Sequence, residues 1–296
     1  MELRQLRTFR TVATLHSFNQ AAKVLDYAQS TVSEQIKILE TDLDVRLFKR
    51  AGKQVALTKA GEVLLQYAQK MLDIEEEIRN EVSGREEVHG SLSIRIPETV
   101  SIYYLPPILK KFHQLFPKVG FSFNNCSYFS LQDELRSGII NLAFLITDTF
   151  RATDLETEKL FALPLVMVTY PENPLASKQN VSIQDIKKET ILVPTADCSY
   201  IRMLETMFTQ EKVELANVLQ FNSIEAIKEC VMIGTGLTVL PEIAAKEEIA
   251  EGSLVVLPWA DGQLYANLLM IWQRNKWTSP ILQAFLDTTR QFLGMA

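Results

Sequence analysis

Residues 17–43 read SFNQAAKVLDYAQSTVSEQIKILETDL, and this stretch decides the fold of the amino-terminal region. In both halves apolar residues recur at i, i+3 or i+4, and i+7, which predicts two short helices with one buried face each. The predicted buried residues are Phe18, Ala21, Ala22 and Leu25 in the first helix, and Val32, Ile36, Leu39 and Leu43 in the second. Ser17 with Gln20 is typical of a capping box that begins the first helix. The second helix would begin at a capping box of Thr31 with Glu34, or at Ser30.

The outward face of the predicted second helix is polar and carries Ser30, Ser33, Glu34 and Lys37. Two short helices joined by a tight turn are typical of a helix-turn-helix, whose second helix enters the major groove of DNA. An ordinary pair of packed helices in a globular core gives the same pattern. The pattern alone therefore leaves both interpretations open.

A β-hairpin is predicted directly after these helices. Two short apolar runs, 45–48 and 55–57, flank the basic, glycine-containing turn 49–54. In that position a hairpin is typical of a wing, and Arg50 and Lys53 would lie along phosphates or reach into the minor groove. The wing favours DNA binding. A helix over residues 3–15 would pack behind, and its arginines either touch phosphate or form an exposed basic face.

Composition limits the function further. The 296 residues include 47% hydrophobic and 22% charged side chains, with a net charge of −6. Residues 1–70 hold 11 Lys and Arg against 7 Asp and Glu, so a positively charged end is joined to an acidic body, which fits DNA contact through one end. The sequence shows no signal peptide, no membrane-spanning run, no zinc-type cysteine spacing and no catalytic motif. We expect a cytoplasmic protein that is not an enzyme, with no catalytic residues, cofactor or metal.

From Thr58 onward apolar residues alternate by threes and fours over about three heptads, which predicts a long helix with an apolar stripe. The stripe comprises Leu64, Tyr67, Ala68, Met71, Ile74, Ile78 and Val82. An apolar stripe of this length needs a partner surface. A second copy of the chain is favoured as that partner over the body of the same chain.

The remaining sequence alternates strands with helices, which predicts an α/β fold. Predicted strands lie at 91–96, 120–126, 141–146, 159–170, 191–193, 215–221, 237–240, 254–257 and 267–272. Predicted helices lie at 103–116, 130–137, 199–210, 224–233 and 279–293. The βαβαβ order of the first three strands indicates a parallel sheet. The apolar segment 159–170 would carry the chain into a second lobe.

Within residues 1–65 the segments SFNQAAKVL, QSTVSEQIKILE, LFKR and LTKAG follow one another, and here the chain resembles the winged helix-turn-helix of LysR-type transcriptional regulators. In the body the resemblance is carried by PPILKKF, by Gly138–Asn141 and by GTGLTVLP at 234–241. Three positions differ from the usual family pattern. Asp44 stands where the family usually has Gly, Asn141 where it often has Asp, and Glu34 where a basic or other polar residue is frequent.

The resemblance implies three parts: a winged helix-turn-helix DNA-binding domain over 1–58, a linker and dimerisation helix over 59–89, and a two-lobed, periplasmic-binding-protein-like α/β effector domain over 90–296. The lobes would comprise about 90–161 with 266–296, and about 162–265. The implied partners are double-stranded DNA, a small-molecule effector and further copies of the chain in a dimer or tetramer. The residues expected to face DNA are Gln29, Ser30, Thr31, Ser33, Glu34, Lys37, Arg50 and Lys53.

A ligand between such lobes is expected at the carboxyl ends of strands and the amino ends of helices. Hydroxyl groups beside free backbone N–H groups suit a carboxylate, so we expect a small anionic effector. The candidate residues are Thr99, Ser101, Thr147, Ser199, Arg202 and Ser223. For each Ser and Thr, plain helix capping is the alternative. Cys198 lies where the peroxide-sensing branch of the family holds a reactive cysteine, but no second cysteine follows about ten residues later, so a redox role is not favoured.

Two other functions fit parts of the sequence. A solute-binding protein with an unrelated helical head would share the two-lobed body, but the missing signal peptide argues against it. An α/β enzyme would need a catalytic constellation, and the sequence shows none.

Overall fold

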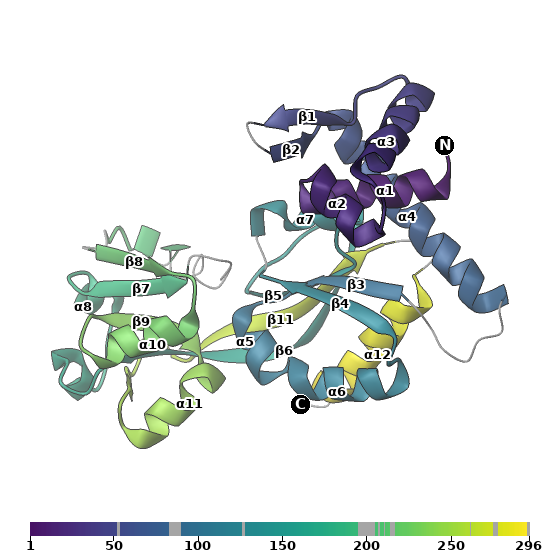
Figure 1. Cartoon of the computed structure of the whole chain (residues 1–296). Coiled ribbons are helices and arrows are strands. Elements are labelled where there is room, and N and C mark those ends of the chain that lie inside the picture. Colours follow the sequence, from purple (N-terminus) through teal and green to yellow (C-terminus); the bar gives the residue numbers. More distant parts are fainter. Residues whose placement is uncertain are drawn as a thin grey trace.

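The computed structural model describes the chain except for residues 52–53, 83–89, 126–127, 195–204, 207, 210, 214–216, 261, 275–277 and 295–296. A helical head with a small hairpin packs beside the first lobe of an elongated body, and the second lobe lies at the far end from the head (Figure 1). The head and linker contain α1 (Leu3–Leu15), α2 (Phe18–Leu25), α3 (Gln29–Leu43), β1 (Phe48–Ala51), β2 (Gln54–Leu57) and α4 (Lys59–Val82).

The head folds around the predicted apolar faces of its first three helices. Leu6 and Phe9 of α1 are fully buried beside Leu39 of α3, and Ala21 of α2 packs against Val32 of α3. Small alanines let α2 and α3 approach closely, as a helix-turn-helix requires. The predicted helix-turn-helix is thus present. Ser17 caps α2, because its Oγ accepts the backbone N–H of Gln20 at 3.3 Å.

Both ends of α3 differ from expectation. The helix begins at Gln29 after Ala28, whose side chain makes no capping bond, so the predicted starts at Thr31 or Ser30 are wrong. Leu39 is the last buried residue of the stripe, since Leu43 is 36% exposed. Asp44 ends the helix with φ 52°, in the left-handed region where Gly is usual and Asp is tolerated.

The wing is a hairpin of β1 and β2, paired in antiparallel register from Phe48 with Leu57 to Ala51 with Gln54. Its first strand starts three residues later than predicted. The physical reason is Glu40 of α3, whose Oε1 accepts the backbone N–H of Leu47 at 2.8 Å, so that only the carbonyl of Leu47 bonds across the hairpin, to the N–H of Thr58 at 2.9 Å. The turn at 52–53 lies outside the described residues.

The long helix α4 starts as predicted after Thr58, whose Oγ1 accepts the backbone N–H of Gly61 at 3.1 Å. Its predicted stripe divides between two surfaces. Ala68 and Leu72 are buried against α1 and α3 in the core of the head. Leu64 of the stripe is half-buried against the same cluster, Leu72 lies outside the predicted stripe, and the side chain of Val82 is not among the described ones. Four stripe residues face outward, since Tyr67, Met71, Ile74 and Ile78 are exposed by 59%, 39%, 48% and 54%.

Two arginines of α1 also turn toward α4 instead of standing free for phosphate. The Nη2 atom of Arg7 lies 2.7 Å from Oε2 of Glu75, and Arg10 donates to the side chain of Gln69 at 3.4 Å. These contacts fix the direction in which α4 leaves the head.

The body is built on one nine-stranded sheet, in the order β4-β3-β5-β11-β6-β9-β7-β8 with β10 paired to β6. The strands are β3 (Gly90–Arg95), β4 (Val119–Asn124), β5 (Leu142–Thr147), β6 (Leu155–Thr169), β7 (Thr190–Pro194), β8 (Asn217–Phe221), β9 (Leu237–Pro241), β10 (Val255–Val256) and β11 (Leu264–Gln273). As predicted, β3 pairs in parallel with β4 and β5. The antiparallel pair β6 and β11 runs through both lobes and joins them.

Helices cover this sheet in both lobes (Figure 1). They are α5 (Glu98–Tyr103), α6 (Leu105–Leu115), α7 (Tyr128–Ser137), the 3-10 helix η1 (Pro174–Ser177), α8 (Ile183–Ile186), α10 (Ile224–Met232), α11 (Glu242–Glu251) and α12 (Pro280–Leu293). The predicted helix at 103–116 corresponds to α6, and the sequence reasoning missed the short α5 that ends just before it. Pro106 and Pro107 cause the break between α5 and α6, because proline has no N–H and fits only the first turn of a helix. The sequence reasoning missed α11, and the predicted helix at 199–210 falls largely outside the described residues.

The second lobe contains a strongly anchored carboxylate at Asp185. Hydrogen bonds from Lys178 and from Ser182 lower the pKa of Asp185 to about 2. Because this pKa is depressed in the folded chain, its stabilisation is complete above about pH 4 and disappears as the pH falls toward 2. Asp185→Asn should therefore destabilise the second lobe by about 1 kcal/mol at pH 7. In thermal unfolding the difference from wild type should shrink between pH 4 and pH 3. A constant difference would contradict this, and exposed Glu172→Gln is the control.

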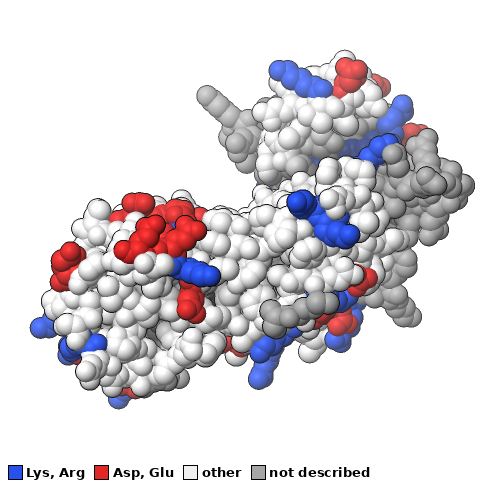
Figure 2. All heavy atoms as spheres, turned by 90° about the horizontal axis from the view of Figure 1, so that it is seen from below, with Lys and Arg blue, Asp and Glu red and all other residues white. Residues whose placement is uncertain are grey.

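Charge is distributed unevenly over the surface. Figure 2 shows acidic side chains gathered on the second lobe, on the side where α11 lies. That helix alone contributes Glu242, Glu247, Glu248 and Glu251. The acidic surface thus lies on the lobe farthest from the basic head, in keeping with DNA contact through the head only.

Candidate nucleic-acid interface and interlobe surface

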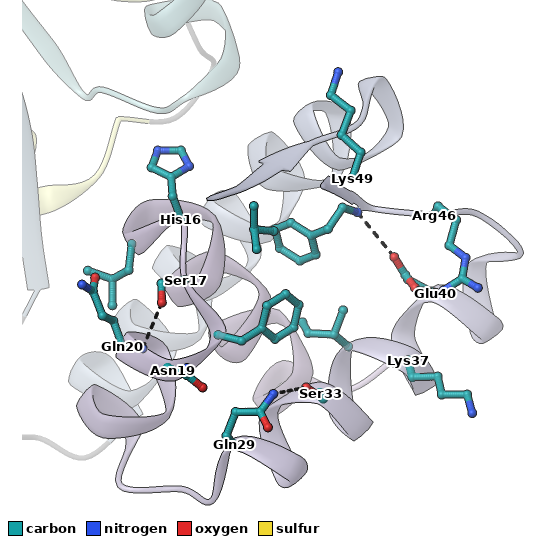
Figure 3. A pocket seen from close by; sticks show the side chains of 15 residues that line it. His16, Ser17, Asn19, Gln20, Gln29, Ser33, Lys37, Glu40, Arg46 and Lys49 are labelled. Atoms are coloured by element: carbon teal, nitrogen blue, oxygen red, sulfur yellow. Dashed lines mark hydrogen bonds and ion pairs between the residues drawn. The ribbon is translucent and has the colours of Figure 1, made fainter. Parts of the chain in front are cut away.

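An open groove of about 760 Å³ lies on the head, between the start of α2, the outward face of α3 and the wing (Figure 3). It is lined by Leu15, His16, Ser17, Phe18, Asn19, Gln20, Gln29, Ser33, Ile36, Lys37, Glu40, Arg46, Phe48, Lys49 and Val55. Three lining side chains are cations and one is an anion. A concave, polar and positively charged surface of this kind suits the phosphates and base edges of DNA.

The outward face of α3, which would be the recognition helix of a helix-turn-helix, contributes three polar residues to the groove. Gln29, Ser33 and Lys37 are spaced by four and therefore share one face of the helix. The side-chain amide of Gln29 donates to Oγ of Ser33 at 2.8 Å, which limits the orientations of Gln29 (Figure 3). Amide and hydroxyl groups held at a helix surface can hydrogen-bond base edges in the major groove.

The other predicted residues of α3 lie beside this groove and not in its lining. Ser30 and Glu34 are exposed, and Thr31 is half-buried. Their spacing places them on the adjacent face of the helix. Their contact with DNA stays a prediction.

The groove also includes residues that sequence reasoning missed, at the amino end of α2. His16, Ser17, Asn19 and Gln20 line its wall (Figure 3). The first N–H groups of a helix have few partners within the helix and suit a phosphate oxygen. The signal was present in the capping pattern of Ser17 with Gln20, which marked this helix end but was interpreted only as local structure.

The wing supplies cations to the opposite wall. Lys49 is exposed and lines the groove, and Arg46 pairs with Oε2 of Glu40 at 2.8 Å. Of the two predicted wing residues, Arg50 lies on β1 opposite Val55, and its side chain is not described. Lys53 lies outside the described residues. Lys49, which the sequence reasoning placed in the turn, lies on β1 and lines the groove without having been predicted as a site residue.

Glu40 sets the distance between the recognition helix and the wing. One carboxylate oxygen accepts the backbone N–H groups of Leu47 and Phe48 at 2.8 and 3.4 Å, and the other accepts Arg46. Only 10% of the Glu40 side chain is exposed. Hydrogen bonds to a charged acceptor are among the stronger ones, so this carboxylate fixes both walls of the groove.

The predicted effector residues divide into three groups. Thr99 and Thr147 are almost fully buried, and the Thr147 hydroxyl is hydrogen-bonded to the backbone of Thr149. Ser101 is half-buried on α5. Ser199 and Arg202, like Cys198, lie outside the described residues.

Ser223 has a partner that the sequence did not indicate. It precedes α10 but makes no capping bond of its own. Instead, its Oγ donates to Oε1 of Glu98 at 3.1 Å, and the backbone N–H of Ile224 donates to Oε2 of Glu98 at 3.0 Å. The amino end of α10 in the second lobe thus holds a carboxylate that comes from α5 of the first lobe.

Among the residues that the structure describes, no group of three or more His, Cys, Asp or Glu side chains could hold a metal ion. Within the same residues, no helix is both long and apolar enough to cross a membrane.

A winged helix-turn-helix head joined to a two-lobed α/β body defines a DNA-binding regulator with a ligand-binding domain. Residues 3–62 match the family described as "Bacterial regulatory helix-turn-helix protein, lysR family", and residues 85–294 match the "LysR substrate binding domain". The chain belongs to the LysR family of transcriptional regulators. A relative from Bacillus subtilis, the "Uncharacterized HTH-type transcriptional regulator YwqM", is 38% identical over 98% of this chain and 99% of its own length. The matched relatives are regulators and not enzymes, as predicted.

Solved structures share the whole architecture. CbnR in complex with its target DNA is 23% identical, with a TM-score of 0.64 over 98% of this chain and 99% of that chain. LysG from Corynebacterium glutamicum, with bound effector Arg, is 21% identical, with a TM-score of 0.65 over 99% of this chain and 98% of that chain. These likenesses concern the fold, and they confirm the predicted order of head, linker helix and two-lobed body.

Proposed function

We propose that this LysR-type regulator reads its operator through the groove on the head. Gln29 and Ser33 would contact base edges, and Lys37 and Lys49 would contact phosphates. The single observation that carries this proposal is the alignment of the three α3 residues along a groove whose other wall is the wing. Ser30, Thr31, Glu34, Arg50 and Lys53 would extend the same interface.

The two groups of residues should give different mutant phenotypes. Lys49→Ala should weaken binding to all duplexes and reduce the slope of log K against log salt by about 1, because one phosphate contact is lost. Gln29→Ala should instead change which sequences are preferred. Selection from a random duplex library, followed by gel shifts at several salt concentrations, measures both effects. Equal losses on every duplex from both variants would contradict the assigned roles, and Lys246→Ala, at an exposed lysine of α11 in the second lobe, is the control.

We further propose that a small anionic effector binds between the lobes and controls DNA binding or promoter activation. Support comes from the helix end at Ser223 and Ile224, which already accommodates a carboxylate, and from the half-buried hydroxyl of Ser101. Ser199 and Arg202 would add to the same site. Thermal-shift titration of the full chain with matched sets of anionic and cationic metabolites tests the charge of the effector. Stabilisation by cations alone would contradict it.

The regulator is also proposed to act as a homodimer or homotetramer in the cytoplasm. The exposed residues of α4 recur at intervals of four, three and four, which is the spacing of a coiled-coil seam. We assign residues 1–58, 59–89 and 90–296 to DNA binding, dimerisation and effector binding, respectively. Operator half-sites would then be read by two heads held together by their linker helices.

A further inference from the structure

The short helix α5 belongs to the first lobe but is held by the second lobe at both of its ends. It follows β3 directly and precedes α6. We propose that α5 is an interlobe latch, with the carboxylate of Glu98 as its releasable end, and that the release of this latch is the step by which the lobes change their relative position. The proposal extends the effector-controlled function above. It rests on that function only for the identity of the ligand that releases Glu98.

The first end of the latch is an ionic contact. Both oxygens of the Glu98 carboxylate are engaged by the start of α10, through the Ser223 hydroxyl and the Ile224 N–H. A carboxylate at a helix amino end is stabilised by the helix dipole as well as by these two hydrogen bonds. Ser223 stands at the N-cap position of α10 but does not cap this helix with its side chain. Its hydroxyl instead binds the Glu98 carboxylate of the first lobe.

The second end of the latch is mainly apolar. The ring of Tyr103 packs against the apolar cluster between the sheet and the helices of the second lobe, which includes Ile224, Ile227 and Ala244. Its hydroxyl donates to the carbonyl of Ala244 at 3.5 Å, and burial raises the pKa of Tyr103. Tyr103 therefore contacts the second lobe through α11, whereas Glu98 contacts it through α10.

An ion pair joins the two helices that receive α5. The ammonium of Lys228 on α10 is only 4% exposed and lies 2.5 Å from the Glu248 carboxylate on α11 and 3.0 Å from Glu225. Because a buried charge is very costly to leave unpaired, α10 and α11 are expected to move as one unit. Loss of the contact at one end of α5 should therefore weaken the contact at the other end. This coupling distinguishes a latch from two independent contacts.

Hydrogen exchange of the full-length chain tests this coupling. Glu98→Ala should accelerate exchange by about tenfold in the peptide that contains Ile224, and also in the α11 peptide that contains Ala244. Tyr103→Ala should accelerate exchange in the same two peptides, and Glu98→Gln should have an intermediate effect. Glu242→Ala, which removes an exposed glutamate from the first turn of α11, is the matched control and should leave the Ile224 peptide unchanged. If each variant affects only the peptide it contacts, the latch is wrong.

Adding a small carboxylate to the Glu98→Ala variant tests whether such an anion can take the place of the Glu98 side chain. In Glu98→Ala the start of α10 lacks its carboxylate, so 100 mM acetate should slow exchange at Ile224 again, whereas chloride at the same ionic strength should not. Equal rescue by both anions, or rescue by neither, would overturn the claim that a small carboxylate can take the place of Glu98. The proposed effector function is tested separately by the thermal-shift titration of the wild-type chain, so the two can fail independently.

Discussion

Ile74→Glu is expected to dissociate the regulator into monomers and to lower its affinity for operator DNA by about 100-fold. Ile74 lies in the exposed apolar seam of α4, between Met71 and Ile78, and is 48% exposed in the single chain. In a dimer this position would be buried against the seam of the second copy. A glutamate there would bury an unpaired carboxylate of each copy in the apolar seam, which strongly disfavours association.

Binding to DNA suffers because two linked heads bind far more tightly than one. When one head is bound, the other is present at a high effective concentration near its half-site, and this advantage is lost in a monomer. Analytical ultracentrifugation measures the oligomeric state, and gel shifts on one duplex measure the affinity. Ile74→Leu is the matched control, because it keeps an apolar side chain of equal volume and should remain oligomeric. A dimeric Ile74→Glu variant with normal affinity would rule out the seam.

Gly61→Ala is expected to destabilise the head by about 3 kcal/mol and to abolish operator binding at physiological temperature. A Cβ atom at this position would lie 2.2 Å from the carbonyl oxygen of Leu47 and 2.9 Å from a methyl group of Leu57. The carbonyl oxygen of Leu47 belongs to the backbone, so it cannot move away by a side-chain rotation. The first turn of α4 would have to move away from the start of the wing, and the wall of the groove that carries Lys49 would move with it.

Circular dichroism during thermal unfolding, combined with gel shifts, measures this effect. Gly120→Ala is a suitable control, since a Cβ there would meet its nearest neighbour at an ordinary 3.7 Å. It should cost less than about 1 kcal/mol and leave DNA binding unchanged. A Gly61→Ala variant that unfolds at the wild-type temperature would show that the wing can shift at little cost.

Periodicity predicted the secondary structure of the head well because its helices have one clearly buried face each. Helix ends were less predictable. The start of α3 at Gln29 has no side-chain cap to mark it, and β1 begins late because a distant carboxylate, Glu40, takes the N–H of Leu47. Such long-range hydrogen bonds leave no local pattern in the sequence.

The candidate sites show the same limit. Ser33 and Lys37 of α3 could be predicted because their spacing places them on one helical face, whereas Gln29 was predicted only from the family resemblance. The wall formed by Asn19 and Gln20 could not, since it depends on how α2 packs against α3. Glu98 was missed because the short helix α5 was not predicted, and because only the tertiary structure brings its carboxylate to α10.

The lobes are joined by a ribbon of two paired strands, β6 and β11, whose register runs from Leu155 with Gln273 to Leu165 with Leu264. Sliding one strand past the other by a single residue would turn every side chain to the opposite face, so this ribbon resists shear. It yields more readily to twisting, and to bending at the irregularity between Leu268 and Leu269. We therefore expect the second lobe to turn about the ribbon more easily than it slides along it, so that a change in its position would twist the sheet that both lobes share.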